Sequence, residues 1–256
     1  MPVEVSGLSR FADSEGVRIH YLDSDVNDRR DPVVFVPGLS DVADDYLRIL
    51  PEFGRRTIVV DLRGRGRSDL PLTGFAREHH MADIGAVLHG AGVDRFHLAT
   101  FSRGTAYALP FALAQPSRVR SMTIGDYIAG EMSFPGENWP EQFVSGRWRG
   151  QPVSERVSLH AIRGIASESV ERRYWSELRT LNPHLMVVRA GRAREGSHVF
   201  IDDTATADFR RAMPSVEIVS FDDCGHDLFR IDPTRYPRLV AEFVARAEIS
   251  DKGRYT

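Results

Sequence analysis

Short, nearly continuous apolar runs recur along this chain and alternate with stretches whose apolar residues repeat at helical spacing. Runs of this kind are typical of strands that are covered on both faces, as in a parallel sheet. The alternation therefore predicts an α/β fold with a doubly wound, mostly parallel sheet, whose ligands bind beyond the carboxyl ends of the strands. The predicted strands are residues 33–36, 57–60, 96–99, 119–124, 185–188 and 216–219, and helical patterns cover 81–91, 205–213 and the stretch that begins at Asp232 and Pro233.

The alternation breaks once, between the strand that ends near Ile124 and the strand that starts at Leu185. This interval, residues 127–182, holds all three tryptophans of the chain. Because insertions of this length in compact domains usually serve a function, we interpret it as a helical cap inserted into a core made of residues 1–126 and 183–256. The alternative is an ordinary pair of crossover helices with tryptophans in the core.

The charge and cysteine content narrow the classes of partner. A net charge of −3 over 256 residues leaves no basic surplus for nucleic acid or anionic lipid. The single cysteine, Cys224, cannot form an internal disulfide, residues 1–10 lack the apolar core of a signal peptide, and no stretch is apolar enough for a membrane span. We therefore expect a cytoplasmic protein that acts on a small molecule, with no nucleic acid or membrane partner. The oligomeric state cannot be read from the sequence.

A serine stands at the turn between a predicted strand and a helical stretch. Residues 96–99 lead into Thr100-Phe101-Ser102-Arg103-Gly104. A serine on such a turn needs small residues two positions to either side, because the strained backbone that exposes its hydroxyl leaves no room for larger side chains. Gly104 meets this condition and Thr100 meets it in part. The alternative is a serine that caps the following helix.

The last predicted strand leads into a loop that carries Gly225 and His226. A histidine directly after a strand can reach a serine at the carboxyl edge of the same sheet and act as its general base. None of the other eight histidines has a comparable position, and we expect the adjacent pair His79 and His80 on a solvated helix face. The alternative for His226 is an ordinary surface histidine.

Four motifs together resemble those of the α/β-hydrolase superfamily across nearly the full length of the chain: Pro37-Gly38-Leu39, the arginine-rich segment 61–68, the turn at Ser102, and Gly225-His226. The resemblance implies that Ser102 is a nucleophile and His226 its base. It also implies an oxyanion hole formed by the backbone amides of Leu39 and Arg103. Segment 61–68 corresponds to a family loop that mainly shapes the fold.

Two positions depart from the family pattern. Thr100 replaces the usual glycine, and Pro110 falls within the helix after the turn, where we expect a kink. Neither departure removes a catalytic atom.

The resemblance leaves two candidates for the acid of a catalytic triad. Many members carry it after the strand that ends here near Val188, where Arg194 stands at the expected position and Glu195 follows. A minority, including one subgroup of haloalkane dehalogenases, carries it after the preceding strand, and Asp126 lies at the corresponding distance beyond Ser102. We predict Asp126 as the acid and Glu195 as the alternative. Asp126 has a structural interpretation too, as the cap of the first helix of the inserted segment.

The resemblance implies a serine hydrolase that acts by acyl transfer on an ester, lactone or related carbonyl, without metal or nucleotide cofactor. Alternatives are a carbon–carbon bond hydrolase or perhydrolase, a cyclase, lyase or epimerase that uses His226 to move protons, and a non-catalytic small-molecule receptor. Aromatic residues of the cap predict a largely apolar pocket for a medium-sized organic substrate; they are Phe134, Trp139, Phe143, Trp148, Tyr174 and Trp175.

Overall fold

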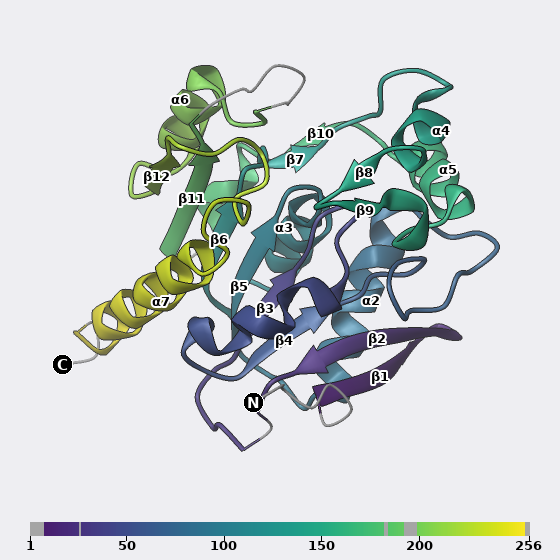
Figure 1. Ribbon diagram of the computed structural model, residues 1–256. Coiled ribbons are helices and arrows are strands. Elements are labelled where there is room, and N and C mark those ends of the chain that lie inside the picture. Colours follow the sequence, from purple (N-terminus) through teal and green to yellow (C-terminus); the bar gives the residue numbers. More distant parts are fainter. Residues whose placement is uncertain (1–7, 26, 182–183, 192–198, 254–256) are drawn as a thin grey trace.

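A computed structural model describes residues 8–25, 27–181, 184–191 and 199–253 of the chain (Figure 1). Within these ranges, eight strands form one sheet in the order β1-β2-β4-β3-β5-β6-β11-β12. Neighbouring strands from β4 to β12 pair in parallel, whereas β1, β2 and β4 pair antiparallel. The predicted α/β class and mostly parallel sheet are thus confirmed. The strands are β1 (Ser9–Ser14), β2 (Val17–Asp23), β3 (Val33–Val36), β4 (Thr57–Val60), β5 (Phe96–Phe101), β6 (Val119–Gly125), β11 (His184–Ala190) and β12 (Glu217–Phe221).

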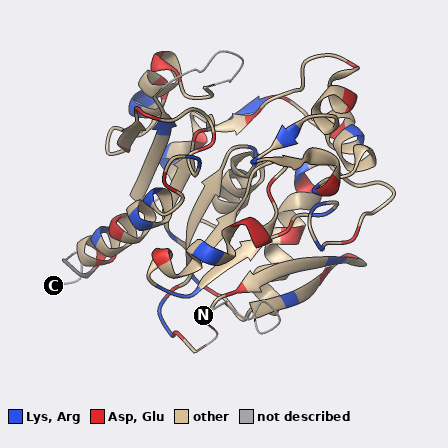
Figure 2. Cartoon of the chain, viewed as in Figure 1, with Lys and Arg blue, Asp and Glu red and all other residues tan. Residues whose placement is uncertain are grey.

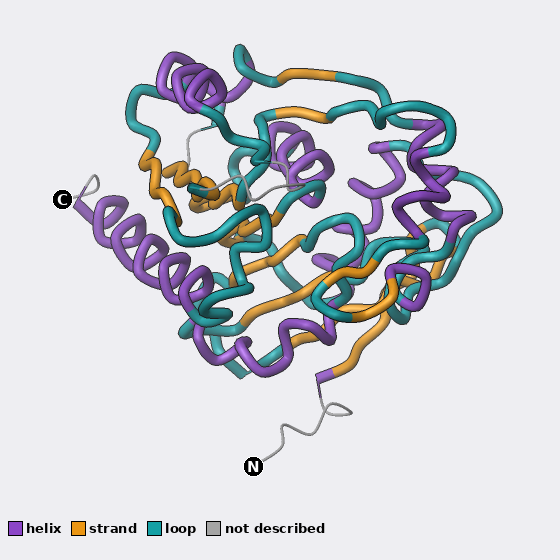
Figure 3. The backbone as a smooth tube through the Cα atoms, turned by 45° about the horizontal axis from the view of Figure 1, so that its top comes forward, coloured by secondary structure: helices purple, strands orange, loops and turns teal. Residues whose placement is uncertain are grey.

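Helices cover both faces of this sheet (Figures 1 and 3). On one face lie α2 (Arg77–Gly90), α3 (Gly104–Ala114) and α6 (Asp203–Ala212), and on the other lie η1 (Ala43–Phe53) and α7 (Arg235–Gly253). Successive side chains of β11 show why these strands have continuous apolar sequences. Leu185 and Val187 join the first apolar core, while Met186 and Val188 join the second.

The sequence did not indicate the hairpin of β1 and β2. It lies at the edge of the sheet, and part of β1 is exposed, so this strand lacks a long apolar run. The last helix was expected at Asp232 and Pro233, but α7 begins at Arg235. The Asp232 carboxylate instead accepts hydrogen bonds from the backbone N–H and the hydroxyl of Thr234 (2.9 and 2.7 Å), which holds a turn before the helix.

Helix α2 does not keep both histidines on a solvated face. His80 is fully buried and its ring stacks on Tyr107, with centroids 4.0 Å apart. Burial and the nearby Arg65 guanidinium hold the pKa of His80 well below its ordinary value, so the ring is neutral. The expectation for His80 was wrong because α3 and the segment 61–68 cover this side of α2.

Residues 127–181, between β6 and β11, form a layer beyond the carboxyl ends of the central strands, at the upper right of Figure 1. Helices of this segment are accompanied by two short strand pairs, β7 with β10 and β8 with β9, which the sequence did not indicate. We refer to this segment as the cap. Its elements are β7 (Gly130–Glu131), α4 (Trp139–Val144), β8 (Arg147–Trp148), β9 (Gln151–Pro152), η2 (Val153–Glu155), α5 (Leu159–Glu168), β10 (Arg172–Arg173) and η3 (Glu177–Thr180).

Acidic and basic residues are interspersed along the helices and loops, as Figure 2 shows. Among the described residues, no helix combines the length and the apolar character that crossing a membrane requires.

Candidate active site

Ser102 lies directly after β5, in a backbone conformation that side chains seldom adopt. Its φ angle is +51°, and its N–H donates to the carbonyl of Gly125 at the end of β6 (2.7 Å). A methyl group added at Gly104 would overlap the carbonyl oxygens of Val36 and Pro37, so only glycine lets α3 begin this close to β3. The strand-to-helix turn predicted at Ser102 is therefore present, and it holds the side chain at the carboxyl edge of the sheet.

Asp126 occupies the equivalent position after β6. Its φ angle is +39°, and its N–H donates to the carbonyl of Val188 in β11 (2.7 Å). One carboxylate oxygen, Oδ1, accepts a hydrogen bond from the N–H of Ala190 (3.2 Å). The side chain is fully buried, so that its two oxygens depend on protein donors.

His226, from the loop after β12, joins these two residues. Its Nδ1 lies 2.7 Å from Oδ2 of Asp126, and its Nε2 lies 2.8 Å from Oγ of Ser102. An ionised carboxylate only accepts hydrogen bonds, so Nδ1 carries the proton and Nε2 is left to accept from the serine hydroxyl. The arrangement can therefore remove the proton of Ser102 as its oxygen attacks. The serine is 8% exposed and the histidine side chain 16%, which leaves both within reach of a ligand.

The backbone amides of Leu39 and Arg103 lie on the two segments that approach Ser102. A Cβ atom added at Gly38 would stand 3.2 Å from Cβ of Ser102, which shows how closely the loop after β3 approaches the serine. Within the described residues, neither amide has a hydrogen-bond acceptor. Both amides are therefore free to donate to a ligand oxygen.

The Arg103 side chain is directed away from the serine into the base of the cap. It forms an ion pair with Glu131 (3.0 Å) and donates to the carbonyl of Met132 (2.8 Å). Its guanidinium carbon also lies 4.2 Å from the ring centroid of Phe134. The residue thus connects the turn at Ser102 to the cap, while its backbone amide remains at the site.

A cavity of about 490 Å³ opens onto Ser102 and His226. This volume is in the range of sites that bind small molecules. Rings of Phe134, Trp139 and Phe143 form a stacked row along it, with centroid separations of 4.5 and 4.6 Å. The residues that line it are Gly38, Leu39, Ser40, Asp41, Phe101, Ser102, Arg103, Tyr127, Met132, Ser133, Phe134, Pro135, Trp139, Phe143, Trp148, Phe200 and His226.

Four of the aromatic residues expected in the pocket, Phe134, Trp139, Phe143 and Trp148, line this cavity. Trp175 does not; its ring packs edge-on against Phe209 of α6, 4.9 Å between centroids, and belongs to the core. Tyr174, buried beside β10, is likewise outside the cavity. Contrary to the expectation, these two residues lie away from the cavity, because this end of the cap packs against α6 and the first apolar core.

Other lining residues carried no signal in the sequence. Phe101 and Phe200 contact the His226 ring (centroids 5.0 and 4.6 Å apart), and the Asp41 carboxylate accepts a hydrogen bond from the Gly38 N–H within the loop after β3. Phe101 has the pattern of a buried strand residue, and neither Phe200 nor Asp41 belongs to a motif that the sequence singles out. Only the fold brings them to the site.

Three other groups bear on the chemistry of the site: Cys224, the alternative acid Glu195 and possible metal ligands. Burial and Asp223 raise the pKa of the Cys224 thiol to about 11, which keeps it protonated and argues against a nucleophilic role. The alternative acid, Glu195, lies outside the described residues, as does Arg194. In the described part of the chain, no group of three or more histidine, cysteine or acidic side chains is placed to hold a metal ion.

The two departures from the family pattern are accommodated. The Thr100 hydroxyl hydrogen bonds with that of Thr105 (2.7 Å), and the Thr100 carbonyl accepts from the hydroxyl of Tyr236 (2.6 Å). Helix α3 continues through Pro110 to Ala114.

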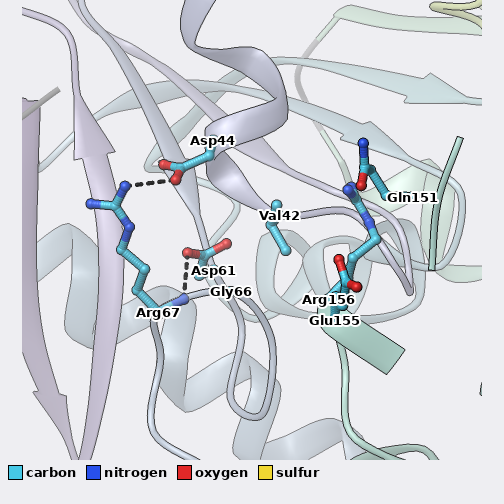
Figure 4. Close-up of a pocket in the computed structure, with 8 residues that line it drawn as sticks. All are labelled: Val42, Asp44, Asp61, Gly66, Arg67, Gln151, Glu155 and Arg156. Atoms are coloured by element: carbon cyan, nitrogen blue, oxygen red, sulfur yellow. Dashed lines mark hydrogen bonds and ion pairs between the residues drawn. The ribbon is translucent and has the colours of Figure 1, made fainter. Parts of the chain in front are cut away.

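A second, polar crevice lies where η2 and β9 of the cap meet the segment 61–68 (Figure 4). The Arg67 guanidinium forms an ion pair with Asp44 (2.6 Å), and the Asp61 carboxylate accepts a hydrogen bond from the backbone N–H of Arg67 (3.1 Å). Asp61 also contacts His20 (2.7 Å) and accepts from the N–H of Ala43 (2.6 Å). These contacts give the segment a structural role, as its sequence indicated.

Comparisons with known proteins agree with this architecture. The sequence profile of the Alpha/beta hydrolase family matches residues 33–243. The AB hydrolase superfamily protein YisY of Bacillus subtilis (strain 168) is 24% identical over 248 residues, covering 83% of this chain and 91% of that protein. Solved structures with the same fold include two hydrolases. The esterase RhEst1 from Rhodococcus sp. ECU1013 has a TM-score of 0.73 and 19% identity, covering 93% of this chain and 98% of that one. Est816, described as an N-acyl homoserine lactone degrading enzyme, has a TM-score of 0.70 and 21% identity, covering 91% of this chain and all of that one.

Proposed function

The chain belongs to the alpha/beta hydrolase family, and on this premise we propose that it is a serine hydrolase that acts by acyl transfer on an ester or lactone. The observation that carries the proposal is the unbroken chain of hydrogen bonds from Ser102 through His226 to Asp126, at 2.8 and 2.7 Å. A serine, an imidazole and a buried carboxylate in this order are the parts that nucleophilic acyl transfer requires.

In the proposed reaction, Oγ of Ser102 attacks the substrate carbonyl carbon while Nε2 of His226 takes the hydroxyl proton. The carbonyl oxygen becomes an oxyanion that accepts hydrogen bonds from the amides of Leu39 and Arg103, and each such donor contributes a factor of about 10² to 10³ to the rate. His226 then gives its proton to the leaving alcohol oxygen as the bond to the carbonyl carbon breaks. An acyl-enzyme remains on Ser102.

The second half of the reaction uses the same groups with water. His226 removes a proton from a water molecule, whose oxygen attacks the acyl carbon, and the histidine then returns the proton to Oγ as the carboxylic acid leaves. Asp126 holds Nδ1 as the protonated nitrogen throughout and stabilises the imidazolium that forms in each half.

The cavity supports a medium-sized, largely apolar substrate, because its lining includes Met132 and the rings of seven phenylalanine, tyrosine and tryptophan residues. Residues 127–182 would act as the cap that covers this substrate, on a core of residues 1–126 and 183–256. The esterase and lactone-degrading enzymes that share the fold support this substrate class, and we further propose a cytoplasmic location.

Turnover of activated esters tests the proposal. Wild type should hydrolyse p-nitrophenyl esters, whereas Ser102→Ala should keep only the residual rate that binding and the oxyanion donors supply, about 10³- to 10⁴-fold above the uncatalysed reaction. Equal rates in the two proteins would rule out acyl-enzyme chemistry and favour proton transfer by His226, as in a cyclase, lyase or epimerase. Tight ligand binding without turnover would favour a receptor.

A further inference from the structure

The turn between β8 and β9 carries an arginine in a conformation that favours other residues. Arg149 and Gly150 form this turn, with φ angles of +47° and +81°. Two-residue turns with two positive φ angles favour Asn-Gly, because most side chains are strained in the left-handed region. Arg149 therefore occupies its position against the preference of the backbone, and its side-chain contacts offset the strain.

One set of contacts joins Arg149 to the loop after β12 that carries His226, which we call the histidine loop. Its Nε lies 3.1 Å from both carboxylate oxygens of Asp227, and one terminal nitrogen lies 2.8 Å from Oδ1. Asp227 directly follows His226 in the chain, and the same Oδ1 accepts a hydrogen bond from the N–H of Phe229 (3.2 Å). A planar guanidinium that binds a carboxylate through two nitrogens fixes its direction as well as its distance. The arginine thus restrains the loop that presents the His226 ring.

A second set of contacts joins the same hairpin to the loop after β3. The other terminal nitrogen of Arg149 lies 3.4 Å from Oδ1 of Asp41, which also accepts from Nε1 of Trp148 (2.6 Å). The second oxygen of Asp41 accepts from the N–H of Gly38 (2.9 Å). Gly38 precedes Leu39, whose amide is one of the two proposed donors to the oxyanion, and we refer to this loop as the oxyanion loop. One carboxylate therefore ties the cap hairpin to the oxyanion loop.

Aromatic rings surround the guanidinium and limit its access to water. Its central carbon lies 4.8 Å from the ring centroid of Phe229, 5.3 Å from Trp148, 5.4 Å from Tyr46 and 5.8 Å from Phe101. Ion pairs in such surroundings are screened less than ion pairs at the surface. The ring of Phe101, next to Ser102 in the chain, also stacks on His226. The cluster is thus continuous with the catalytic groups.

We infer, on the basis of the proposed function, that Arg149 is a positioning residue. From its place in the cap, it fixes the positions of the histidine loop and the oxyanion loop relative to each other. Through Asp227 it sets where Nε2 of His226 meets the serine, and through Asp41 it sets where the Leu39 amide meets the oxyanion. Arg149 is not one of the described residues that line the cavity. Its loss should therefore act on the chemical step rather than on substrate binding, since small displacements of reacting groups are costly.

Arg149→Asn is the test, because asparagine suits the turn and removes only the guanidinium. We expect kcat for a p-nitrophenyl ester to fall about 10- to 100-fold while KM stays within about threefold. Arg149→Lys keeps the charge without the planar fork and should recover part of the lost kcat. Arg147→Asn is the matched control: this arginine is exposed on the same hairpin, its side chain donates to the Gly150 carbonyl, and its loss should leave kcat unchanged.

The inference is overturned if Arg149→Asn keeps wild-type kcat, or if KM rises while kcat does not change. Should that variant fail to fold, Asp227→Asn removes the ion pair while preserving shape, and it should lower kcat at least about threefold at constant KM. Unchanged kcat in Asp227→Asn would then refute the inference. If Ser102→Ala retains activity, the proposed function fails; if Ser102 is required and Arg149 is dispensable, only this inference fails.

Discussion

Replacing Asp126 by asparagine should disable the site while leaving the fold intact. The carboxylate accepts two hydrogen bonds, from the Ala190 N–H at Oδ1 and from Nδ1 of His226 at Oδ2. Asparagine has one acceptor and one donor in their place. If its oxygen faces Ala190, its NH₂ group faces Nδ1, which must then lose its proton and accept. Nε2 of His226 would carry the proton instead and could no longer receive one from Ser102.

The size of the effect follows from this change of tautomer. The same replacement in a serine–histidine–aspartate triad lowers kcat by about 10⁴, which corresponds to about 5 kcal/mol on the activation free energy. The opposite orientation of the amide would place its NH₂ group against the Ala190 N–H, two donors facing each other, and costs about 1–3 kcal/mol for the unpaired groups. The shape of the residue is kept, so the free energy of unfolding should change by no more than that cost.

Steady-state hydrolysis of an activated ester and thermal unfolding together measure both quantities. Glu195→Gln, at the alternative acid position, is the matched variant. It should retain kcat within a few-fold of wild type, because the sequence predicts Asp126 rather than Glu195 as the acid. A well-folded Asp126→Asn enzyme with kcat within tenfold of wild type would refute the reasoning. A larger loss in Glu195→Gln than in Asp126→Asn would transfer the role to Glu195.

Three further changes test other parts of the account. Gly104→Ala should lower the free energy of unfolding by about 3 kcal/mol, because the added methyl group overlaps backbone oxygens at the end of β3. Gly85→Ala in α2, where the added carbon would have its nearest neighbour at 3.6 Å, should leave the free energy of unfolding unchanged or raise it. Urea titrations of both variants measure this, and equal losses of stability in Gly104→Ala and Gly85→Ala would contradict the reasoning. Trp139→Ala should raise KM about tenfold, since the ring lines the cavity and such a contact is worth about 1–3 kcal/mol. Trp175→Ala should lower the thermal midpoint and leave KM alone; a KM increase in both would count against the assigned cavity. Burial lowers the pKa of His97 from 6.5 to about 4, so between these values the unfolded chain binds more protons than the folded chain. The free energy of unfolding should therefore decrease by about 3 kcal/mol as the pH falls from 6.5 to 4, and His97→Asn should flatten this slope; an unchanged slope would show that other groups cause it.

The central strands could be predicted from the sequence because burial on both faces leaves a continuous apolar run. Strands β3 and β4 begin and end where those runs do, and β5, β6 and β11 extend theirs by a few residues. The edge strand β1 could not be predicted this way, since solvent covers part of it and relaxes the demand for apolar residues. Similarly, His80 is polar by type, and only the packing of α3 on α2 decides that its ring is buried.

The positions of Ser102 and Asp126 could be predicted because each directly follows a strand. Neighbouring parallel strands end at the same edge, so residues far apart in the chain meet there. The contacts of Arg149 could not be predicted, because Asp41 and Asp227 come from opposite ends of the chain and approach it only once the cap has folded over the core. The tryptophans show the same limit. The sequence places all three in one segment, but it does not indicate which of their rings line the cavity.

Covalent trapping measures the central claim most directly. The protein is incubated with a fluorophosphonate, digested, and the modified peptide is identified by mass spectrometry. We predict a single stoichiometric adduct on the oxygen of residue 102, formed rapidly in wild type, much more slowly in Asp126→Asn and not at all in Ser102→Ala. An adduct on another residue, or none in an enzyme that still hydrolyses esters, would contradict the account.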